Sequence, residues 1–423
     1  MGDESGGPTN IPEEVVSEIL CYLPVKSLIR FTIVCKSWFR LIRNNHRFAM
    51  KNYLIRTTSS SKVLDNVDYM FSSIRKSGNP CLYSFTKANS FRFSTKFECL
   101  PDLSIGISNS CHGIICFHLW REGEEILLCN PLIQEIVLLP PCPTKTTYNG
   151  LKALGFDPIQ KDYKVVSIDF LSTDNYHCTV NLYSLRHGHW RNLYVSSSPR
   201  CIYGIEGRTS NSNGRMHNWF FSKELESGKI GKALLSFDMV EEVLEELPMP
   251  NCEDPHAHDH RLLSSTRWQA CLSCFSWHFN GRFIHVWVLK DYIWCKAIVV
   301  EFPGYDRELM QPSNFWINDK KLFVSIKKGN IIEVFHYNLV TQQLKNTGRK
   351  GHLFSSSGYV ESLVSIKHFM SLHNECKHDV DGNQNVDEDA TLKQEDNGEY
   401  IFREVSRKGV RWSRTLNLIK PSK

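Results

Sequence analysis

Apolar residues follow a helical spacing at the start of this chain. From Val15 to Leu23 they recur every three or four positions, which places them on one face of an α-helix. Pro24 ends this pattern, because the proline ring cannot continue a helix. Similar spacing predicts two further short helices, over residues 26–33 and 36–43. The chain therefore begins with a small unit of three predicted helices.

The beginning of the first helix carries its own signal. Asn10 and Glu13 have the spacing of a capping box, with Asn10 as the N-cap and Pro12 in the first turn. A unit of about 40 residues is too small to bury all of these apolar side chains by itself. We expect the surplus to pack partly on the rest of the chain and partly on a helix of a partner. The alternative is an ordinary helical cap on a larger fold.

After Tyr53 the pattern changes to short strands that repeat. Segments of four mainly apolar and aromatic residues, which we call phrases, begin 45 to 55 positions apart, at Leu82, Leu127, Leu182, Leu235, Ile284 and Val334. A strand repeat close to fifty residues is typical of β-propeller blades. Six phrases predict six blades, and a strand over residues 360–366 would close the ring by joining the blade near Leu82. A two-sheet β-sandwich is the alternative all-β fold.

The helical segment resembles the F-box. The resemblance rests on Ile11-Pro12-Glu13-Glu14, Glu18-Ile19-Leu20, Leu23-Pro24, Lys26-Ser27-Leu28, Arg30-Phe31 and Cys35-Lys36-Ser37-Trp38. It implies a non-catalytic adaptor that docks on the SKP-type subunit of an SCF ubiquitin ligase and, through it, on cullin and RING subunits. By this resemblance, Phe31 and Trp38 hold the three helices together. The residues that it places at or beside the SKP-type contact are Ile11, Pro12, Ile19, Leu20, Leu23, Pro24 and Leu28.

The strand region resembles the F-box-associated interaction domain of plant F-box proteins. The matching segments are Ser110–Cys116, Cys129-Asn130-Pro131, Leu154–Asp157 with Lys161–Val166, and Val180–Leu193. The glycine pair of kelch repeats is missing, so the kelch-like repeat is degenerate. This resemblance implies that the β domain binds a target protein. Its group includes the S-locus F-box proteins, which act in pollen self-incompatibility.

Composition excludes several other classes of protein. Hydrophobic residues make up 41% and aromatic residues 12%, which suits a packed globular chain. The net charge of +5 is weak and no long basic run is present, so we predict no nucleic-acid partner. No apolar stretch approaches the ~18 residues of a membrane span. The N-terminus is too polar for a signal peptide, and we expect the 15 cysteines to be reduced thiols in a cytoplasmic or nuclear protein.

Candidate chemistry is sparse. Cys271 and Cys274 have zinc-like spacing but no second pair, and no catalytic motif is recognisable, so we predict no metal, no cofactor and no enzyme activity. One polar cluster is predicted to lie in an inter-blade loop, which is either a solvated loop or a substrate contact at the propeller rim. Its residues are His256, His258, Asp259 and His260.

These observations predict a mainly β protein with a small N-terminal helical domain. The predicted parts are a disordered N-terminus (1–10), a three-helix F-box (11–54), a six-bladed β-propeller-like substrate-binding domain (62–370), an acidic disordered segment (373–399) and a basic tail (400–423). The predicted function is substrate recognition for an SCF ubiquitin ligase, with an unidentified target protein. The alternatives are a propeller that binds a partner without ubiquitination, a role in pollen self-incompatibility, and a propeller enzyme with a helical cap.

Overall fold

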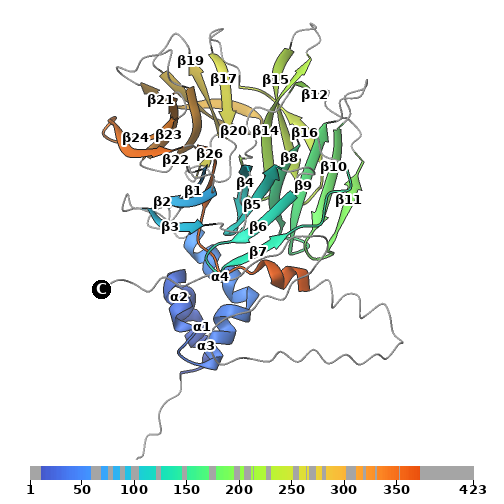
Figure 1. The fold of residues 1–423 in the computed structure, drawn as a ribbon, viewed down its shortest axis with the longest axis vertical. Helices are drawn as coiled ribbons and strands as arrows, with labels where there is room; N and C mark the ends of the chain where they lie inside the picture. The colour runs from blue at the N-terminus through green and yellow to red at the C-terminus, as the bar shows by residue number, and fades with distance from the viewer. Residues whose placement is uncertain are drawn as a thin grey trace, which may run out of the picture.

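Four helices precede a series of antiparallel β-sheets (Figure 1). The computed structural model describes residues 11–58, 68–74, 80–85, 91–96, 104–120, 125–144, 150–170, 178–194, 201–203, 211–212, 214–224, 230–250, 257–262, 264–265, 273–278, 283–301, 311–317, 321–328, 331–351 and 353–371.

The three predicted helices are confirmed, and a fourth follows them. Their bounds are α1 (Glu13–Cys21), α2 (Val25–Phe31), α3 (Lys36–Asn44) and α4 (His46–Thr58). The apolar residues of α4 are spread around its circumference instead of forming one stripe. Periodicity therefore gave no signal for this helix.

The predicted capping box at the start of α1 is wrong. The N-cap residue is Pro12, which offers no side-chain acceptor, and Asn10 lies outside the described residues. The Glu13 carboxylate instead accepts a hydrogen bond of 2.7 Å from the Ser37 hydroxyl of α3. Glu13 and Glu14 also place negative charge in the first turn, where the helix dipole favours it.

The described strands form six sheets, rather than the two of a β-sandwich. Sheet 1 contains β26 (Leu353–Tyr359), β1 (Asp68–Ile74), β2 (Pro80–Phe85) and β3 (Phe91–Lys96). Sheet 2 contains β4 (Ser104–Cys111), β5 (Ile114–Trp120), β6 (Glu125–Asn130) and β7 (Glu135–Leu138). Sheet 3 contains β8 (Leu151–Asp157), β9 (Asp162–Phe170), β10 (Cys178–Ser184) and β11 (His189–Leu193).

In sheets 4 to 6, as in the first three sheets, most strands lie next to the strand that precedes or follows them in the sequence. Sheet 4 contains β14 (Met216–Glu224), β15 (Ile230–Asp238) and β16 (Leu244–Leu247), with β12 (Cys201–Tyr203) and β13 (Asn211–Ser212) beside β14. Sheet 5 contains β17 (Ala257–Leu262), β19 (Ser273–His278), β20 (Phe283–Lys290) and β21 (Ile293–Glu301). Sheet 6 contains β18 (Ser264–Ser265), β22 (Gln311–Ile317), β23 (Lys321–Lys328), β24 (Ile331–Asn338) and β25 (Leu344–Gly351).

The six repeated phrases of the sequence occupy equivalent places in these sheets. Each phrase lies in the next-to-last strand of its sheet, which is β2, β6, β10, β15, β20 or β24. These strands are covered on both sides by neighbours, so they carry the most continuous apolar runs. That is why their period was visible in the sequence.

Sheet 1 joins the two ends of the β region, but not through the predicted segment. β26 pairs with β1, with Tyr69 opposite Gly358 and Phe71 opposite Ser356. The prediction of a strand over residues 360–366 is wrong, because residues 360–365 form no strand and residues 366–371 form a short helix. The carbonyls of this segment are bound by a side chain of sheet 2, as described below, instead of by a neighbouring strand.

One turn chemistry recurs in the connections β6–β7, β8–β9, β15–β16 and β24–β25. In each case an Asp or Asn Oδ1 accepts a hydrogen bond from the backbone N–H two residues on, and the residue four positions on has a positive φ. The acceptors are Asn130, Asp157, Asp238 and Asn338, at 2.8 to 3.1 Å. The positive-φ residues are Gln134, Lys161, Glu242 and Gln342.

Two tryptophans fasten neighbouring sheets at their outer strands. The Trp190 indole of β11 donates a hydrogen bond of 2.9 Å to the Pro140 carbonyl, which follows β7 of the preceding sheet. The Trp294 indole of β21 makes the equivalent bond of 2.7 Å to the Pro248 carbonyl, which follows β16. The Leu-Pro ends of the sequence repeat therefore serve as acceptors for the next sheet.

Candidate functional site

The N-terminal helices expose apolar side chains to solvent. Ile19 of α1 is 57% exposed and Tyr22 is 67% exposed, while Ile33, between α2 and α3, is 89% exposed. So many solvent-exposed apolar side chains on so small a unit are typical of a surface that binds another protein. The other exposed apolar residues of these helices are Ile11, Val15, Val34, Phe39 and Leu54.

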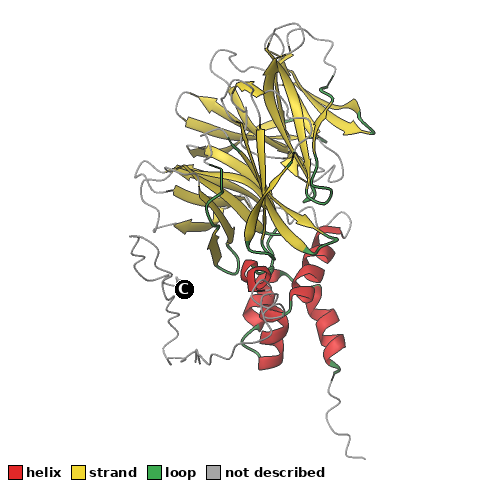
Figure 2. Cartoon of the chain, turned by 90° about the vertical axis from the view of Figure 1, so that its right-hand side faces the viewer, coloured by secondary structure: helices red, strands yellow, loops and turns green. Residues whose placement is uncertain are grey.

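Other side chains of the same helices are buried in the interior of the molecule. Leu20, Val25 and Leu28 are at most 2% exposed and share one hydrophobic core with residues of sheets 2 and 3. Figure 2 shows the helices directly beneath the strands. The members of this core from the β domain include Cys111, Ile114, Cys116, Leu128, Leu154, Tyr163, Val165 and Tyr183.

The seven predicted contact residues divide between these two environments. Ile11, Pro12, Ile19 and Pro24 are exposed, and Leu23 is half-buried. Leu20 and Leu28 lie in the shared core instead. Helical spacing identified the apolar stripe, but it could not tell burial within the chain from burial by a partner. The predicted aromatic pair, Phe31 and Trp38, does join two helices, with ring centroids 5.6 Å apart.

Several residues that hold the helices in place were missed, because α4 was missed. Asn52 of α4 is fully buried, and its Nδ2 donates to the carbonyls of Cys21 at 2.7 Å and Leu23 at 3.1 Å. These bonds satisfy carbonyls at the end of α1, where helical partners run out. A lone asparagine in a helix without clear periodicity gives no sequence signal for such a role.

An aromatic cluster connects α4 to the β domain. The Tyr53 ring lies edge-on to the His112 ring, with centroids 4.9 Å apart. His112 Nδ1 lies 2.8 Å from the Tyr163 hydroxyl, and that hydroxyl lies 3.9 Å from Met50 Sδ. Burial raises the pKa of Tyr163 well above its usual value, so the hydroxyl stays protonated. The cluster is therefore a neutral hydrogen-bonded contact between the two parts of the chain.

Three histidines are held neutral by burial. Desolvation lowers the pKa of His46 at the start of α4 to about 4, and His368 nearby lowers it further in the same direction. Desolvation also lowers the pKa of His112 to about 4 and that of His217, in β14, to about 3. Each of these histidines therefore stays neutral in the folded chain at pH values where the same histidine in the unfolded chain, with a pKa near 6.5, is protonated.

This difference predicts that mild acid destabilises the protein. Below about pH 6.5 the unfolded chain binds more protons than the folded chain, so the free energy of unfolding falls as the pH is lowered toward about 4. The expected loss for a histidine as deeply buried as His217 is roughly 2 kcal/mol. Urea unfolding at a series of pH values measures this loss. His217→Gln should flatten the profile in that window, and an unaltered slope would contradict the prediction.

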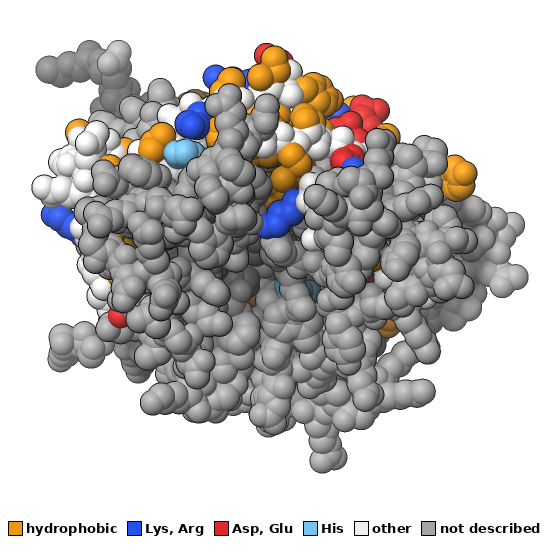
Figure 3. All heavy atoms as spheres, turned by 90° about the horizontal axis from the view of Figure 1, so that it is seen from above, with side chains coloured by type: hydrophobic (Ala, Val, Ile, Leu, Met, Phe, Trp, Pro, Cys, Tyr) orange, Lys and Arg blue, Asp and Glu red, His pale blue; other side chains and the backbone are white. Residues whose placement is uncertain are grey.

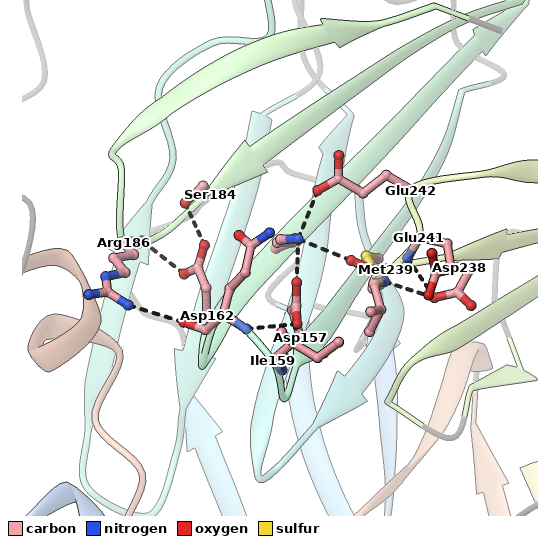
Figure 4. Close-up of polar contacts among 12 residues, drawn as sticks. Asp157, Ile159, Asp162, Ser184, Arg186, Asp238, Met239, Glu241 and Glu242 are labelled. Carbon is pink, nitrogen blue, oxygen red and sulfur yellow. Dashed lines mark hydrogen bonds and ion pairs between the residues drawn. The ribbon is translucent and has the colours of Figure 1, made fainter.

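A buried group of charges joins sheet 3 to sheet 4 (Figure 4). Lys164 Nζ lies 2.6 Å from Asp157 Oδ2, 2.8 Å from Glu242 Oε1 and 3.1 Å from the Met239 carbonyl. The Lys164 and Asp157 side chains are 1% exposed. Arg191 of β11 forms a further ion pair with Glu242. The arrangement satisfies the lysine from two sheets at once, which fixes their relative position.

The electrostatics of this group favour the charged forms. Burial alone would raise the pKa of Asp157, but the hydrogen bond and charge of Lys164, with two backbone N–H donors, lower it below its ordinary value. The pKa of Glu242 is lowered in the same way by Lys164 and Arg191, against the effect of burial. Since each carboxylate is already bound by cations of the same chain, we assign this group a structural role.

The predicted histidine cluster does not lie in a loop along its whole length. Residues Ala257–Leu262 form β17, which pairs with β19, so the loop prediction is wrong for His258, Asp259 and His260. Prolines and polar residues nearby favoured a loop, but pairing with the apolar β19 decided the structure. His256 lies outside the described residues, and substrate contact by these four residues stays a prediction.

Other candidate chemistry is also limited in the part of the chain that the structure describes. There, no group of three or more His, Cys, Asp or Glu residues is placed to hold a metal ion. The cysteines whose side chains the structure describes form no disulfides, and burial raises the pKa of Cys111, Cys116 and Cys129 to about 12, so these three thiols stay protonated. Among the described helices, none is both long and apolar enough to span a bilayer. Figure 3 faces the side of the β domain away from the helices, where the described side chains are a mixture of hydrophobic, basic and acidic groups.

Comparison with protein families accounts for both parts of the chain. A model of the F-box domain matches residues 8–49, and a model of the F-box associated beta propeller domain matches residues 67–366. The chain belongs to the F-box proteins with an F-box-associated β-propeller (FBA) domain. Its F-box is made of α1–α3 and the start of α4, and the FBA domain contains the six sheets.

Curated relatives of this F-box protein come from a plant. An F-box/kelch-repeat protein of Arabidopsis thaliana is 28% identical over 326 residues, covering 75% of this chain and 85% of the relative. A second F-box protein of the same plant is 23% identical over 348 residues, covering 74% and 78%. Among solved structures, TolB from Acinetobacter baumannii aligns with a TM-score of 0.45 and 10% identity, covering 74% of this chain and 72% of TolB.

Proposed function

We propose that this protein is the substrate-recognition subunit of an SCF ubiquitin ligase. The observation that carries the proposal is the two-sided character of the F-box. Its helices bury Leu20 and Leu28 in a hydrophobic core that extends into the FBA domain, while Ile19 and Tyr22 are exposed to solvent. An SKP-type adaptor bound to the exposed side of the helices would thereby be connected to the substrate-binding domain, which is attached to the same helices.

The exposed members of the predicted contact supply the adaptor surface. Ile11, Pro12, Ile19 and Pro24 offer apolar area at the surface, with Leu23 partly accessible beside them. Leu20 and Leu28 act indirectly, because they fix the spacing of α1 and α2 from within the core. Burial of such an apolar surface is the main favourable contribution in most protein–protein association.

The FBA domain is proposed to be a six-bladed β-propeller, with each of the six sheets as one blade. The pairing of β26 with β1 supports this, because it places the last strand of the domain in the same blade as the first. The helices occupy one side of this propeller (Figure 1), and the other side is proposed to bind the target protein. The residues His256, His258, Asp259 and His260 are proposed to contribute to target contact.

The proposed mechanism is proximity rather than chemistry by this chain. Binding the target next to the cullin–RING assembly raises the effective concentration of target lysines near the ubiquitin-charged E2 enzyme. No residue of this protein has to react in such a step. The described carboxylates and histidines with shifted pKa are engaged in packing or in ion pairs, which agrees with a non-catalytic adaptor.

The experiment that tests this proposal uses the full chain and purified SKP-type adaptor, cullin and RING subunits. We expect the chain to form a stable complex with the adaptor and to be ubiquitinated itself when E1, E2 and ubiquitin are added. A full chain that unfolds cooperatively, yet forms no complex with the adaptor, would contradict the proposal. Adaptor binding without any ubiquitin transfer would favour a binding module that acts outside degradation.

A further inference from the structure

The segment that follows β26 connects the FBA domain to the F-box. We call residues 360–371 the C-terminal strap. Figure 1 shows it in orange-red between the sheets and the helices, far in sequence from both of its neighbours. Its last part, residues 366–371, is helical. Ile366 and Phe369 of the strap are at most 1% exposed, so this segment is packed as tightly as a domain interior.

The first attachment of the strap is to sheet 2. Asn130 Nδ2 donates hydrogen bonds to the carbonyls of Ser362 at 3.1 Å and Val364 at 2.8 Å. Two strap carbonyls that lie in no sheet are thereby satisfied by one buried side chain. The backbone approach is close, because a Cβ added at Gly113, whose φ is 77°, would lie only 2.3 Å from Ser362 Cβ.

Glu135 of β7 provides a second attachment to sheet 2. Its carboxylate accepts hydrogen bonds of 2.7 Å from the Ser365 hydroxyl and 2.7 Å from the Ile366 backbone N–H. A third bond, of 3.3 Å, comes from the Lys367 N–H. These donors belong to the first turn of the strap helix, which has no helical acceptors for them, and the negative charge also suits that end of the helix.

The third attachment of the strap is to the helices that carry the F-box. Arg56 of α4 donates a hydrogen bond of 2.9 Å to the Glu361 carbonyl, and Lys26 of α2 lies 2.6 Å from the Glu361 carboxylate. Phe369 lies edge-on to His46, at the start of α4, with centroids 4.5 Å apart. Phe369 also contacts Tyr163 of sheet 3 at 4.7 Å, so one strap side chain touches both parts of the molecule.

We propose that the C-terminal strap fixes the orientation of the F-box on the FBA domain. The strap binds sheet 2 through Asn130 and Glu135, and it contacts α2 at Lys26 and α4 at both Arg56 and His46. Together with the aromatic cluster around His112, these anchors oppose rotation of the helices about the chain connection between α4 and β1. The two parts of the protein therefore move as one body.

The consequence for ubiquitin transfer rests on the proposed function. A fixed F-box holds the target at one distance and direction from the E2 enzyme, which limits the set of target lysines that can react. The strap residues then act as positioning residues, because their contacts are with sheet 2 and with α2 and α4 of the same chain. A loosened strap should widen the range of lysines reached while leaving adaptor binding intact.

The decisive experiment measures amide hydrogen exchange in the full chain carrying Glu135→Ala. Glu135 lies in β7 and touches the strap but none of the F-box helices, so a purely local role leaves those helices unchanged. We expect amides of α2 and α4 to exchange about tenfold faster in this variant. Phe369→Ala and Arg56→Ala remove contacts at the two ends of the strap and should produce the same change. Unchanged exchange in α4 for both Glu135→Ala and Arg56→Ala would overturn the proposal.

A matched control separates orientation from general instability. Phe335→Ala removes an equally buried phenylalanine from sheet 6, away from the strap, and should leave α2 and α4 exchange at the wild-type rate. Small-angle scattering of the adaptor complexes should show one shape for the wild type and a broader distribution for Glu135→Ala. If the wild type fails to bind the adaptor, the proposed function fails but the exchange result still decides the strap. If the adaptor binds and exchange is unchanged, the strap proposal alone fails.

Discussion

Replacing Lys164 with methionine is expected to lower the free energy of unfolding by about 3–5 kcal/mol, because removal of one partner strands a buried charge. Lys164 is the cation shared by Asp157 and Glu242, and its side chain is 1% exposed. Methionine keeps a similar length but leaves Asp157 without its counter-charge in an environment that burial already makes unfavourable. Urea unfolding followed by tryptophan fluorescence measures the loss.

A matched control for this loss is Arg215→Met. Arg215 also pairs with a carboxylate, Asp238 at 2.7 Å, but its side chain is 46% exposed. An exposed ion pair contributes roughly 0–1 kcal/mol, so this change should be nearly silent. The double variant Lys164→Met with Asp157→Asn should recover part of the stability, since it removes the stranded charge. Equal small losses for Lys164→Met and Arg215→Met would show that the buried pair contributes no more than a surface one.

Replacing Ile19 with aspartate is expected to weaken adaptor binding at least about 100-fold, because it places a charge in an apolar contact. Ile19 is 57% exposed in the free protein, so the free energy of unfolding should change by no more than about 0.5 kcal/mol. Titration calorimetry with purified SKP-type adaptor measures the affinity, and urea unfolding confirms the fold.

The control for this substitution is Ile159→Asp. Ile159 is 75% exposed in the turn between β8 and β9, which belongs to the FBA domain and not to the F-box, and its change should leave the affinity unaltered. Leu20→Ala provides the converse case. Leu20 is 2% exposed, so its truncation should cost about 2–5 kcal/mol of stability. Full affinity in a folded Ile19→Asp variant would show that the adaptor contact lies elsewhere.

Sequence reasoning located the strands whose physical signal is strongest. The phrases at Leu127, Leu182 and Leu235 were found because strands covered on both sides need unbroken apolar runs. The F-box helices were found through their apolar spacing and the stop at Pro24. These features are local, so a single sequence contains them.

The missed features depend on contacts between distant residues. The run from Val360 to Ile366 is apolar enough for a strand, but Asn130 and Glu135, more than 200 positions away, bind its backbone and direct it elsewhere. Similarly, Leu20 and Ile19 are adjacent apolar residues on one helix, yet Leu20 is buried in the core and Ile19 is exposed to solvent. Only the packed arrangement of the helices with the rest of the chain distinguishes them.

The recurring Asx turns have a consequence for how such a protein can diverge. At Asn130, Asp238 and Asn338 the same short-range hydrogen bond sets the reversal of the chain. Each reversal is encoded within about five consecutive residues and requires nothing from the connections at the other ends of its strands. Insertions and substitutions in those connections can therefore accumulate without disturbing these turns, so one scaffold can acquire new targets by drift of its connections alone.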